Sequence, residues 1–357
     1  MNEKGNLSIN SENFLPIIKK WLYTDKDIFI RELVSNACDA VTKLKKLMIM
    51  GEADHIPADE AFSVHVVLNK EEKIMQIVDN GIGMTHEEIK KYINQIAFSG
   101  AQDFLNKYKD KANEDQIIGH FGLGFYSAFM VASKVRVVSK AYGEEQAWAW
   151  ESDGVEGYTI EVAERETNGT DVILTLKDNT EEENYDQFLS EYGLKDLIKR
   201  YSNYVRYPVQ MMVTKSREKE RPADAGDDYK PEYEDYEELE TINSMTPIWK
   251  KRSSDVSEED YNEFYKSTFH DFEDPARTVS FHAEGTLEYD ALLYIPSRAP
   301  FDLYSKDYEK GLALYSSNVL IMEKCADLLP DYYNFVRGVV DSQDISCLLY
   351  TSPSPRD

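Results

Sequence analysis

Apolar residues recur with the spacing of an α-helix from residue 11 to residue 50, and the pattern breaks near Thr24 and Asp25. A break of this kind predicts two helices, the second of which begins at a cap provided by Asp25 or Asp27. The apolar positions of the second helix lie on one side, as expected for a helix that covers a core. These positions are Leu33, Val34, Ala37, Val41 and Leu44.

The opposite side of this second helix carries a row of polar residues. At about 100° per residue, Asn36, Asp39 and Lys43 lie almost in line with Glu32. An ordinary solvated face with an Asp39–Lys43 pair would show the same pattern. The row is therefore a candidate site only if other motifs point to the same place.

The segments after the second helix alternate between strand and helix patterns. A polar, weakly patterned stretch at residues 99–118 interrupts them. The strand patterns occupy residues 62–69, 73–80, 134–140, 146–152, 157–164, 170–177 and 209–214, and the helix patterns occupy residues 85–97 and 194–205. This order predicts one α/β domain over residues 1–215, a two-layer α+β sandwich with a largely antiparallel or mixed sheet on one side and helices on the other.

Residues 216–240 contain eleven acidic residues, four basic residues and two prolines, which predicts an acidic, flexible linker. A second, partial α/β domain is predicted over residues 241–345. Its expected elements are a helix at 257–267, strands at 278–284, 287–296 and 311–322, and a helix at about 328–340. Residues 346–357 match nothing before them and are expected to be a foreign or disordered tail.

Composition narrows the class of protein. The chain has 357 residues and a formal net charge of −26, and so acidic a surface argues against nucleic acid as the main partner. The first residues lack the apolar core of a signal peptide, and no apolar run is long enough for a membrane helix. Cys38, Cys325 and Cys347 are far apart and form no CxxC pair, so we expect a reducing, cytoplasmic location without disulfides or a zinc site.

The motif IVDNGIGM, at residues 77–84, is a candidate ligand site. A strand pattern ends in Asp79, and Gly81 and Gly83 then allow a tight turn with the backbone close to a ligand. A buried carboxylate at a strand end can accept a hydrogen bond from an exocyclic amine such as adenine N6. A plain Asp-Asn-Gly turn has the same composition, so the motif alone is weak.

A second glycine motif, IIGHFGLGFYSAF, covers residues 117–129. Gly119, Gly122 and Gly124 precede an apolar helical run, and free backbone N–H groups at a helix start suit an anionic phosphate. The motif has neither the Lys of a Walker A loop nor the spacing of a Rossmann fold. Thr170 follows a glycine at the start of a strand pattern, where threonine is common without any function.

The order and intervals of these motifs resemble the Bergerat-type ATP site shared by gyrase B subunits, MutL, sensor histidine kinases and heat-shock protein 90. Within that superfamily, FIRELVSNACDA, DNGIGMT, IAFSG and IGHFGLGFYSAFMVA are most similar to the heat-shock protein 90 chaperone family, in its bacterial HtpG type. The resemblance continues through TPIWKK, EEDYNEFYK and LPDYYNFVRGVVDSQD, and it covers residues 1 to about 345. It implies an ATP-dependent chaperone that binds unfolded client proteins and homodimerises through a C-terminal domain, with no nucleic-acid or membrane partner.

The resemblance also assigns roles to matching residues. It implies that Glu32 activates the attacking water and that Asn36 holds Mg²⁺. Asp79 would read the adenine amine, with Thr170 helping through water. The other residues that it places around the nucleotide are Asp39, Lys43, Gly83, Met84, Ser99, Gly119, Gly122, Gly124 and Phe125.

Within that set, the resemblance implies several kinds of contact. Met84 would pack against the base, and Asp39 and Lys43 would line the pocket. The second glycine motif, together with Phe125, would cradle the phosphates. Residues 94–118 would be the lid that closes over the nucleotide.

Two departures from the family pattern limit what is implied. The family often has Lys where this chain has Phe98, so a charged lid contact there is in doubt. The family also continues, after about residue 345, into a loop whose Arg reaches the γ-phosphate, and Arg356 stands in an unrelated context. Because such a cation can contribute about 10³–10⁵ in rate, we expect this polypeptide alone to hydrolyse ATP slowly.

Two alternatives remain open. A nucleotide-binding module without turnover would show the same motifs, and comparing ATP hydrolysis with that of Glu32→Ala would separate it from an ATPase. A sensor-type protein kinase is the other alternative. Against it, we find no His-Glu phosphoacceptor helix, and such kinases lack a carboxylate at the position of Glu32.

Overall fold

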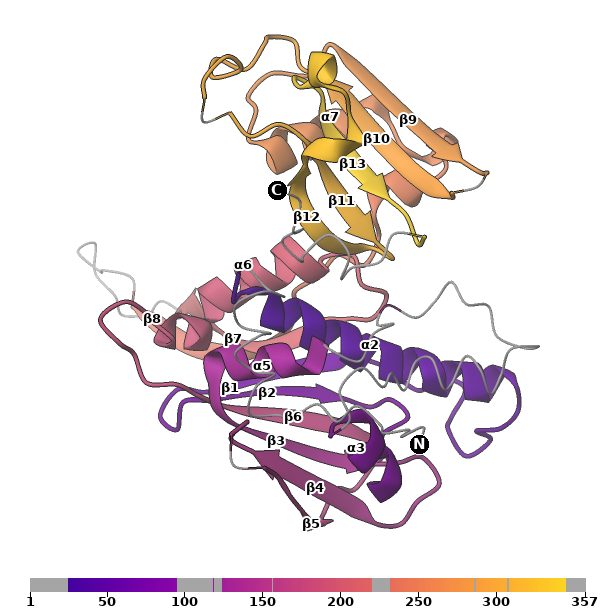
Figure 1. Cartoon of the computed structure of the whole chain (residues 1–357), viewed down its shortest axis with the longest axis vertical. Coiled ribbons are helices and arrows are strands. Elements are labelled where there is room, and N and C mark those ends of the chain that lie inside the picture. Colours follow the sequence, from indigo (N-terminus) through magenta and orange to yellow (C-terminus); the bar gives the residue numbers. More distant parts are fainter. Residues whose placement is uncertain are drawn as a thin grey trace, which may run out of the picture.

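The computed structural model of the chain contains two units, each built on one β-sheet (Figure 1). It describes residues 25–94, 118, 124–155, 157–219, 232–285, 287–306 and 308–344. The larger unit comes first in the sequence and has an eight-stranded sheet, and the second unit has a five-stranded sheet. Figure 1 shows helices α2 (Ile28–Ile49) and α6 (Glu191–Ser202) between the larger sheet and the second unit.

The larger sheet has the strand order β5-β4-β3-β6-β2-β1-β7-β8. Its strands are β1 Val64–Asn69, β2 Ile74–Asp79, β3 Ala132–Lys140, β4 Ala147–Ser152, β5 Thr159–Ala163, β6 Gly169–Leu176, β7 Val209–Glu218 and β8 Tyr233–Thr241. All neighbouring strands run antiparallel except β1 and β7, which run parallel. A mixed sheet with helices packed on it confirms the predicted fold class.

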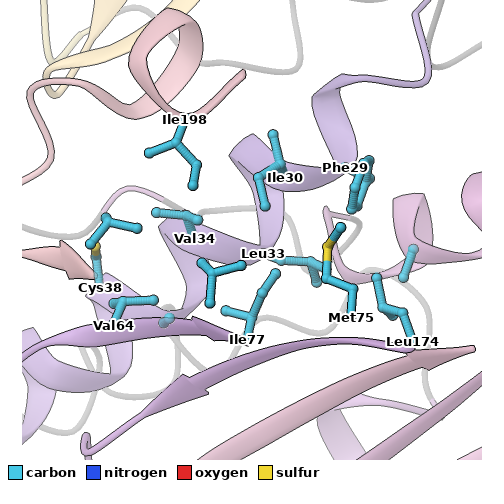
Figure 2. Close-up of a cluster of buried hydrophobic side chains, with 14 of the residues drawn as sticks. Phe29, Ile30, Leu33, Val34, Cys38, Val64, Met75, Ile77, Leu174 and Ile198 are labelled. Carbon is cyan, nitrogen blue, oxygen red and sulfur yellow. The ribbon is translucent and has the colours of Figure 1, made fainter. Parts of the chain in front are cut away.

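Helices α2 and α6 cover one face of this sheet, and α2 is held there by its apolar side. The whole predicted stripe is buried, and Figure 2 shows Leu33 pointing toward Met75 and Ile77 of β2. Burying one such aliphatic side chain contributes about 1.5–3 kcal/mol, so the stripe fixes the rotation of α2 on the sheet. Among the described residues, the shorter helices of this unit are α3 His86–Tyr92, α5 Ala128–Val131, η3 Gly124–Ser127 and η4 Asp186–Leu189.

The two candidate caps of α2 have different roles. Asp27 occupies the cap position, but its side chain makes no capping hydrogen bond. Asp25 instead accepts a hydrogen bond from the backbone N–H of Asp27 at 3.0 Å, which orders the residues just before the helix.

The second unit packs helix α7 (Glu258–Phe269) against a sheet with the order β12-β11-β13-β10-β9. Its strands are β9 Arg277–Ala283, β10 Tyr289–Ile295, β11 Leu312–Ser316, β12 Val319–Cys325 and β13 Arg337–Asp341. Four single 3₁₀ turns complete it: η5 Ile248–Lys250, η6 Ser253–Asp255, η7 Ala326–Leu328 and η8 Asp331–Tyr333. Ser257 and Asp260 form a capping box at the start of α7, and Trp249, Tyr265 and Tyr294 lie in the core beneath it.

The single strand predicted over residues 311–322 is wrong, because this segment is a hairpin of β11 and β12. Ser317 and Asn318 form its turn, with φ of 50° and 69°. Two successive residues with positive φ are the signature of a type I′ turn, whose twist suits a two-residue hairpin. The Ser-Asn pair lacks the glycine that usually signals such a turn. The apolar residues on either side of it therefore resembled one uninterrupted strand.

The helix predicted at about residues 328–340 is also wrong. The segment contains η8 and then β13, which pairs antiparallel with β10 and parallel with β11. Gly338 has φ of 154°, and an added Cβ would overlap the carbonyl oxygen of Leu292. Pairing on both sides of a central strand overrides the weak helical spacing of this segment.

The prediction of a flexible linker at residues 216–240 is wrong for the part that the structure describes. Residues up to Glu218 complete β7, and residues 233–241 form β8, the edge strand of the larger sheet. Basic residues of β7 face acidic residues of β8, as in the Arg217–Glu234 pair at 2.7 Å. The acidic run is therefore compensated across the strand pair, and the larger unit extends beyond residue 215.

Some predictions concern residues outside the described ranges, namely the first helix, most of the lid, the middle of the linker and the tail at 346–357. Cys38 and Cys325 are buried and not disulfide-bonded. Within the ranges given above, no helix is both long and apolar enough to cross a membrane.

Candidate functional site

The turn that follows β2 packs its backbone directly against helix α2. The Ile82 N–H donates to the Ala40 carbonyl at 3.0 Å, and a Cβ on Gly81 would overlap the backbone of Ala40. Gly83 has φ of 67°, and a Cβ there would overlap the carbonyl oxygen of Lys140. The two glycines of the first motif are therefore required by close approach to the protein's own backbone, while the predicted approach to a ligand stays a prediction.

The carboxyl group of Asp79 lies inside this junction. Its side chain is buried, and Oδ1 accepts a hydrogen bond from the Gly81 N–H at 2.8 Å. Burial raises the pKa of Asp79 to about 7, although the Gly81 N–H and the nearby Arg165 guanidinium oppose that rise. A buried carboxyl whose pKa is close to neutral is a candidate ligand-binding group.

Thr170 lies directly opposite Asp79 in the pairing of β2 with β6. Its hydroxyl is 2.8 Å from the hydroxyl of Ser139, which accepts a hydrogen bond from the Met84 N–H at 2.9 Å. Met84 and Thr170 are thus linked through the Ser139 hydroxyl, and Thr170 is the strand-pairing partner of Asp79. Ser139 was not predicted, because a serine in a strand pattern carries no signal of its own.

The polar row of α2 lies on the same side as the glycine motif. A Cβ on Gly124 would overlap a carboxylate oxygen of Glu32, so this glycine lets η3 approach α2. The Asp39 carboxylate is buried and accepts a hydrogen bond from the Ile118 N–H at 2.8 Å. The simple alternative of a fully solvated face is therefore excluded for Asp39.

The remaining residues of the predicted site differ in exposure. Asn36 is exposed on the surface of α2, whereas Lys43 and Phe125 are partly buried. Phe125 packs edge to face against Trp150, with ring centroids 5.7 Å apart. Ser99, Gly119 and Gly122 lie outside the described residues.

Arg31 is a part of the site that the sequence analysis missed. Its side chain is 1% exposed and donates from Nε and Nη2 to one carboxylate oxygen of Glu32, at 3.0 and 2.7 Å. Nη1 points toward the carbonyl oxygens of Leu320 and Ile321 in β12, at 3.4 and 3.5 Å. Arg31 therefore connects the Glu32 carboxylate to the second unit, and no periodicity could reveal partners so distant in the sequence.

Two family models match consecutive parts of the chain. The model described as "Histidine kinase-, DNA gyrase B-, and HSP90-like ATPase" matches residues 25–181. The model described as "Hsp90 protein" matches residues 187–238 and 227–347. Together, the two matches extend over both units.

Curated proteins of high similarity agree with these matches. "Chaperone protein HtpG" of Clostridium botulinum (strain Hall) is 47% identical over 344 residues, which are 96% of this chain and 54% of that protein. "Chaperone protein HtpG" of Clostridium perfringens (strain 13) is 46% identical over the same shares. The chain spans about half the length of the curated relatives it matches.

Proposed function

Because this chain belongs to the Hsp90 family, we propose that it binds Mg-ATP in the junction of α2, the β2 turn and β6, and that it hydrolyses ATP as an ATP-dependent molecular chaperone. The observation that carries this proposal is the buried carboxyl of Asp79, at the start of a turn in which Gly81 and Gly83 leave no room for a side chain. Such a group can accept a hydrogen bond from the adenine N6 amine.

In this proposal, Asp79 reads the adenine and its neighbours complete the base site. Thr170 joins through water, and Met84 packs its side chain against the base. The network through Ser139 supports this arrangement, because it fixes the Met84 backbone and the Thr170 hydroxyl relative to each other.

The hydrolytic step is assigned to Glu32, which would orient a water molecule and accept its proton. Gly124 supports this role, because it brings η3 against the carboxylate of Glu32. The glycine motif that includes Gly119, Gly122 and Gly124, followed by Phe125, would present backbone N–H groups to the phosphates. Asp39 and Lys43 would line the pocket, and Ser99 would belong to the lid over residues 94–118.

Asn36 is the residue that would hold Mg²⁺. Its amide oxygen is a hard donor, and it lies one helical turn from Glu32 on the exposed side of α2. No group of three or more His, Cys, Asp or Glu in the described part of the chain could hold a metal ion, so phosphate and water oxygens would complete the set. When bound, the ion would neutralise phosphate charge.

The broader assignments follow from the family and remain proposals for this chain. We propose that its partners are unfolded or partly folded client proteins, that longer relatives homodimerise, and that the protein works in the cytoplasm. We also propose that the 357-residue polypeptide by itself turns ATP over slowly.

A nucleotide-binding module without turnover is the second candidate. The Arg31–Glu32 pair favours it, because one carboxylate oxygen of Glu32 already accepts two hydrogen bonds from the guanidinium and so has less capacity left to accept one from water. ATP hydrolysis under single-turnover conditions, with Glu32→Ala as the blank, separates the two. We expect a slow rate above the blank, and a rate equal to the blank would favour the binding module.

A further inference from the structure

The loop between β5 and β6 lies behind the turn that carries Asp79, and it is tied to that turn by Arg165. The Arg165 side chain is about one-tenth exposed, and its Nη2 donates to the backbone carbonyl of Asp79 at 2.7 Å. The same guanidinium pairs with the Asp171 carboxylate at 3.0 Å and donates to the Thr167 carbonyl at 2.6 Å. Three acceptors on different sides leave this guanidinium little freedom to move.

Asn168 provides a second tie from the same loop. Its side-chain amide donates to the Gly81 carbonyl at 2.7 Å. The loop thus holds the carbonyl of the peptide group that follows Asp79 and a second carbonyl two residues further along the same turn, at Gly81. The loop itself is tied to β3, since Lys140 donates to the Glu166 carbonyl at 3.0 Å.

Gly169 makes this close contact possible. Its φ is 124°, and an added Cβ would overlap the Asp79 carbonyl and lie 2.9 Å from Nη2 of Arg165. Any other residue would therefore separate the loop from the turn. This glycine stands immediately before Thr170 and so serves the same junction.

We propose that Arg165 and Asn168 are positioning residues for adenine recognition, which hold the turn from behind so that the Asp79 carboxylate meets the adenine amine in one orientation. This inference rests on the proposed binding of ATP. Neither residue touches the nucleotide in this account. Both act through the backbone of the turn.

The charge of Arg165 adds a second effect. Burial raises the pKa of Asp79, Arg165 lowers it and Asp171 raises it. On the side of α2, the pKa of the Cys38 thiol is raised by burial and by the charges of Asp39 and Asp79. Removing the guanidinium should therefore raise the pKa of Asp79 further. ATP binding would then require a higher pH, because the ionised carboxylate is the better acceptor.

The test is the affinity for ATP and for ADP, measured by calorimetry from about pH 6 to about pH 9, in the wild type and in Arg165→Gln. We expect roughly tenfold weaker binding of both nucleotides, because one charged hydrogen bond to the turn is lost, and a midpoint of the pH profile that moves upward. Arg136→Gln is the matched control. Arg136 also pairs with two carboxylates, Glu151 and Glu161, but it lies on β3 away from the turn, and we expect neither change.

The outcomes separate this inference from the proposed function. If the wild type binds no ATP, or if Asp79→Asn binds as tightly as the wild type, the proposed function fails. If Asp79→Asn loses binding while Arg165→Gln keeps both the affinity and the pH midpoint, the positioning role is wrong. Should Arg165→Gln not fold, Asn168→Ala removes only the tie to Gly81, and its unchanged affinity for ATP would overturn the inference.

Discussion

At the scale of single residues, burial and hydrogen bonding act in opposite directions on the carboxyl of Asp79. Burial raises its pKa to about 7, whereas the Gly81 N–H and Arg165 stabilise its ionised form. The group is therefore balanced between its two forms near neutral pH. A ligand amine that donates to it shifts this balance toward the carboxylate.

The stability of the larger unit should depend on pH through this group. The pKa of Asp79 is raised above its ordinary 3.8, so ionisation of this group destabilises the folded state. This destabilisation is zero below about pH 4, grows as the pH rises, and reaches its full value above about pH 7. Asp79→Asn cannot ionise. We expect the free energy of unfolding of the wild type to fall relative to the variant across this window, by about 4 kcal/mol at most. Denaturant unfolding of both proteins at several pH values measures it, and a pH-independent difference would contradict the assignment.

The glycines of the Asp79 turn give a second prediction. Gly83→Ala places a Cβ against the Lys140 carbonyl at a positive φ, so we expect a loss of stability of about 2 kcal/mol or more and weaker ATP binding. Gly143→Ala is the matched control, because Gly143 has φ of 83° with nothing within 4 Å of its added Cβ. It should cost only about 1 kcal/mol and leave binding unchanged. Thermal unfolding measures the stability of both variants, and calorimetry measures their ATP binding. Equal losses in the two variants would mean that positive φ alone, and not the close contact with Lys140, makes Gly83 necessary.

The arrangement of the candidate site was predictable from the sequence only where its residues stand close together in one motif. Gly81, Gly83 and Asp79 stand in one short motif, and the structure brings them together in a turn that packs on α2 at Gly81 and on the end of β3 at Gly83. Arg31 and Arg165 could not be found in this way, because each acts on a group that is distant in the sequence. A charged residue in an isolated pattern has no feature that distinguishes such a role from solvation.

At the scale of elements, the sequence predicted helices and strands correctly where the apolar residues followed one clear helical or strand periodicity. The stripe of α2 and the two strands before and at Asp79 lie where they were predicted. The hairpin of β11 and β12 was missed because its turn lacks glycine, and β13 was missed because its pairing is entirely non-local. These two errors lie in the second unit, and they do not affect the residues assigned to the candidate site.

The acidic residues of β8 suggested a flexible linker in the sequence, but in the structure they form ion pairs with basic residues of β7. Glu234 of β8 pairs with Arg217, and Glu238 pairs with Lys215 at 2.8 Å. These pairs are exposed, so each contributes only a fraction of a kcal/mol and is screened by salt. The edge strand should therefore be the part of the larger sheet that opens most easily.

Charge reversal tests this account of β8. In Arg217→Glu, the new carboxylate faces Glu234 across the strand pair, so we expect faster hydrogen exchange at the backbone amides of residues 233–241. The double variant Arg217→Glu with Glu234→Arg restores opposite charges and should restore protection. Equal exchange in all three proteins would show that backbone pairing alone holds this strand.

At the scale of the whole molecule, the two units meet around the N-terminal half of α2 and around α6. Arg31 reaches the carbonyls of β12, and Arg200 of α6 pairs with Glu323 at 2.5 Å. Tyr204 packs edge to face on Trp249, with ring centroids 4.7 Å apart. The residue proposed for hydrolysis, Glu32, is thus connected to the second unit through Arg31. Among the described residues, the partners of Asp79, which is proposed to bind adenine, belong to the larger unit.

This division predicts that ATP binding depends on the Asp79 junction and not on the contact between the units. Isothermal calorimetry of Mg-ATP with the 357-residue chain and with its Asp79→Asn variant, at about pH 8, tests the central claim most directly. The account predicts saturable binding of one ATP by the wild type. It predicts a loss of at least about tenfold in affinity for the variant, whose fold is retained, because a buried amide replaces the required acceptor. Equal affinity of the two folded proteins would contradict it.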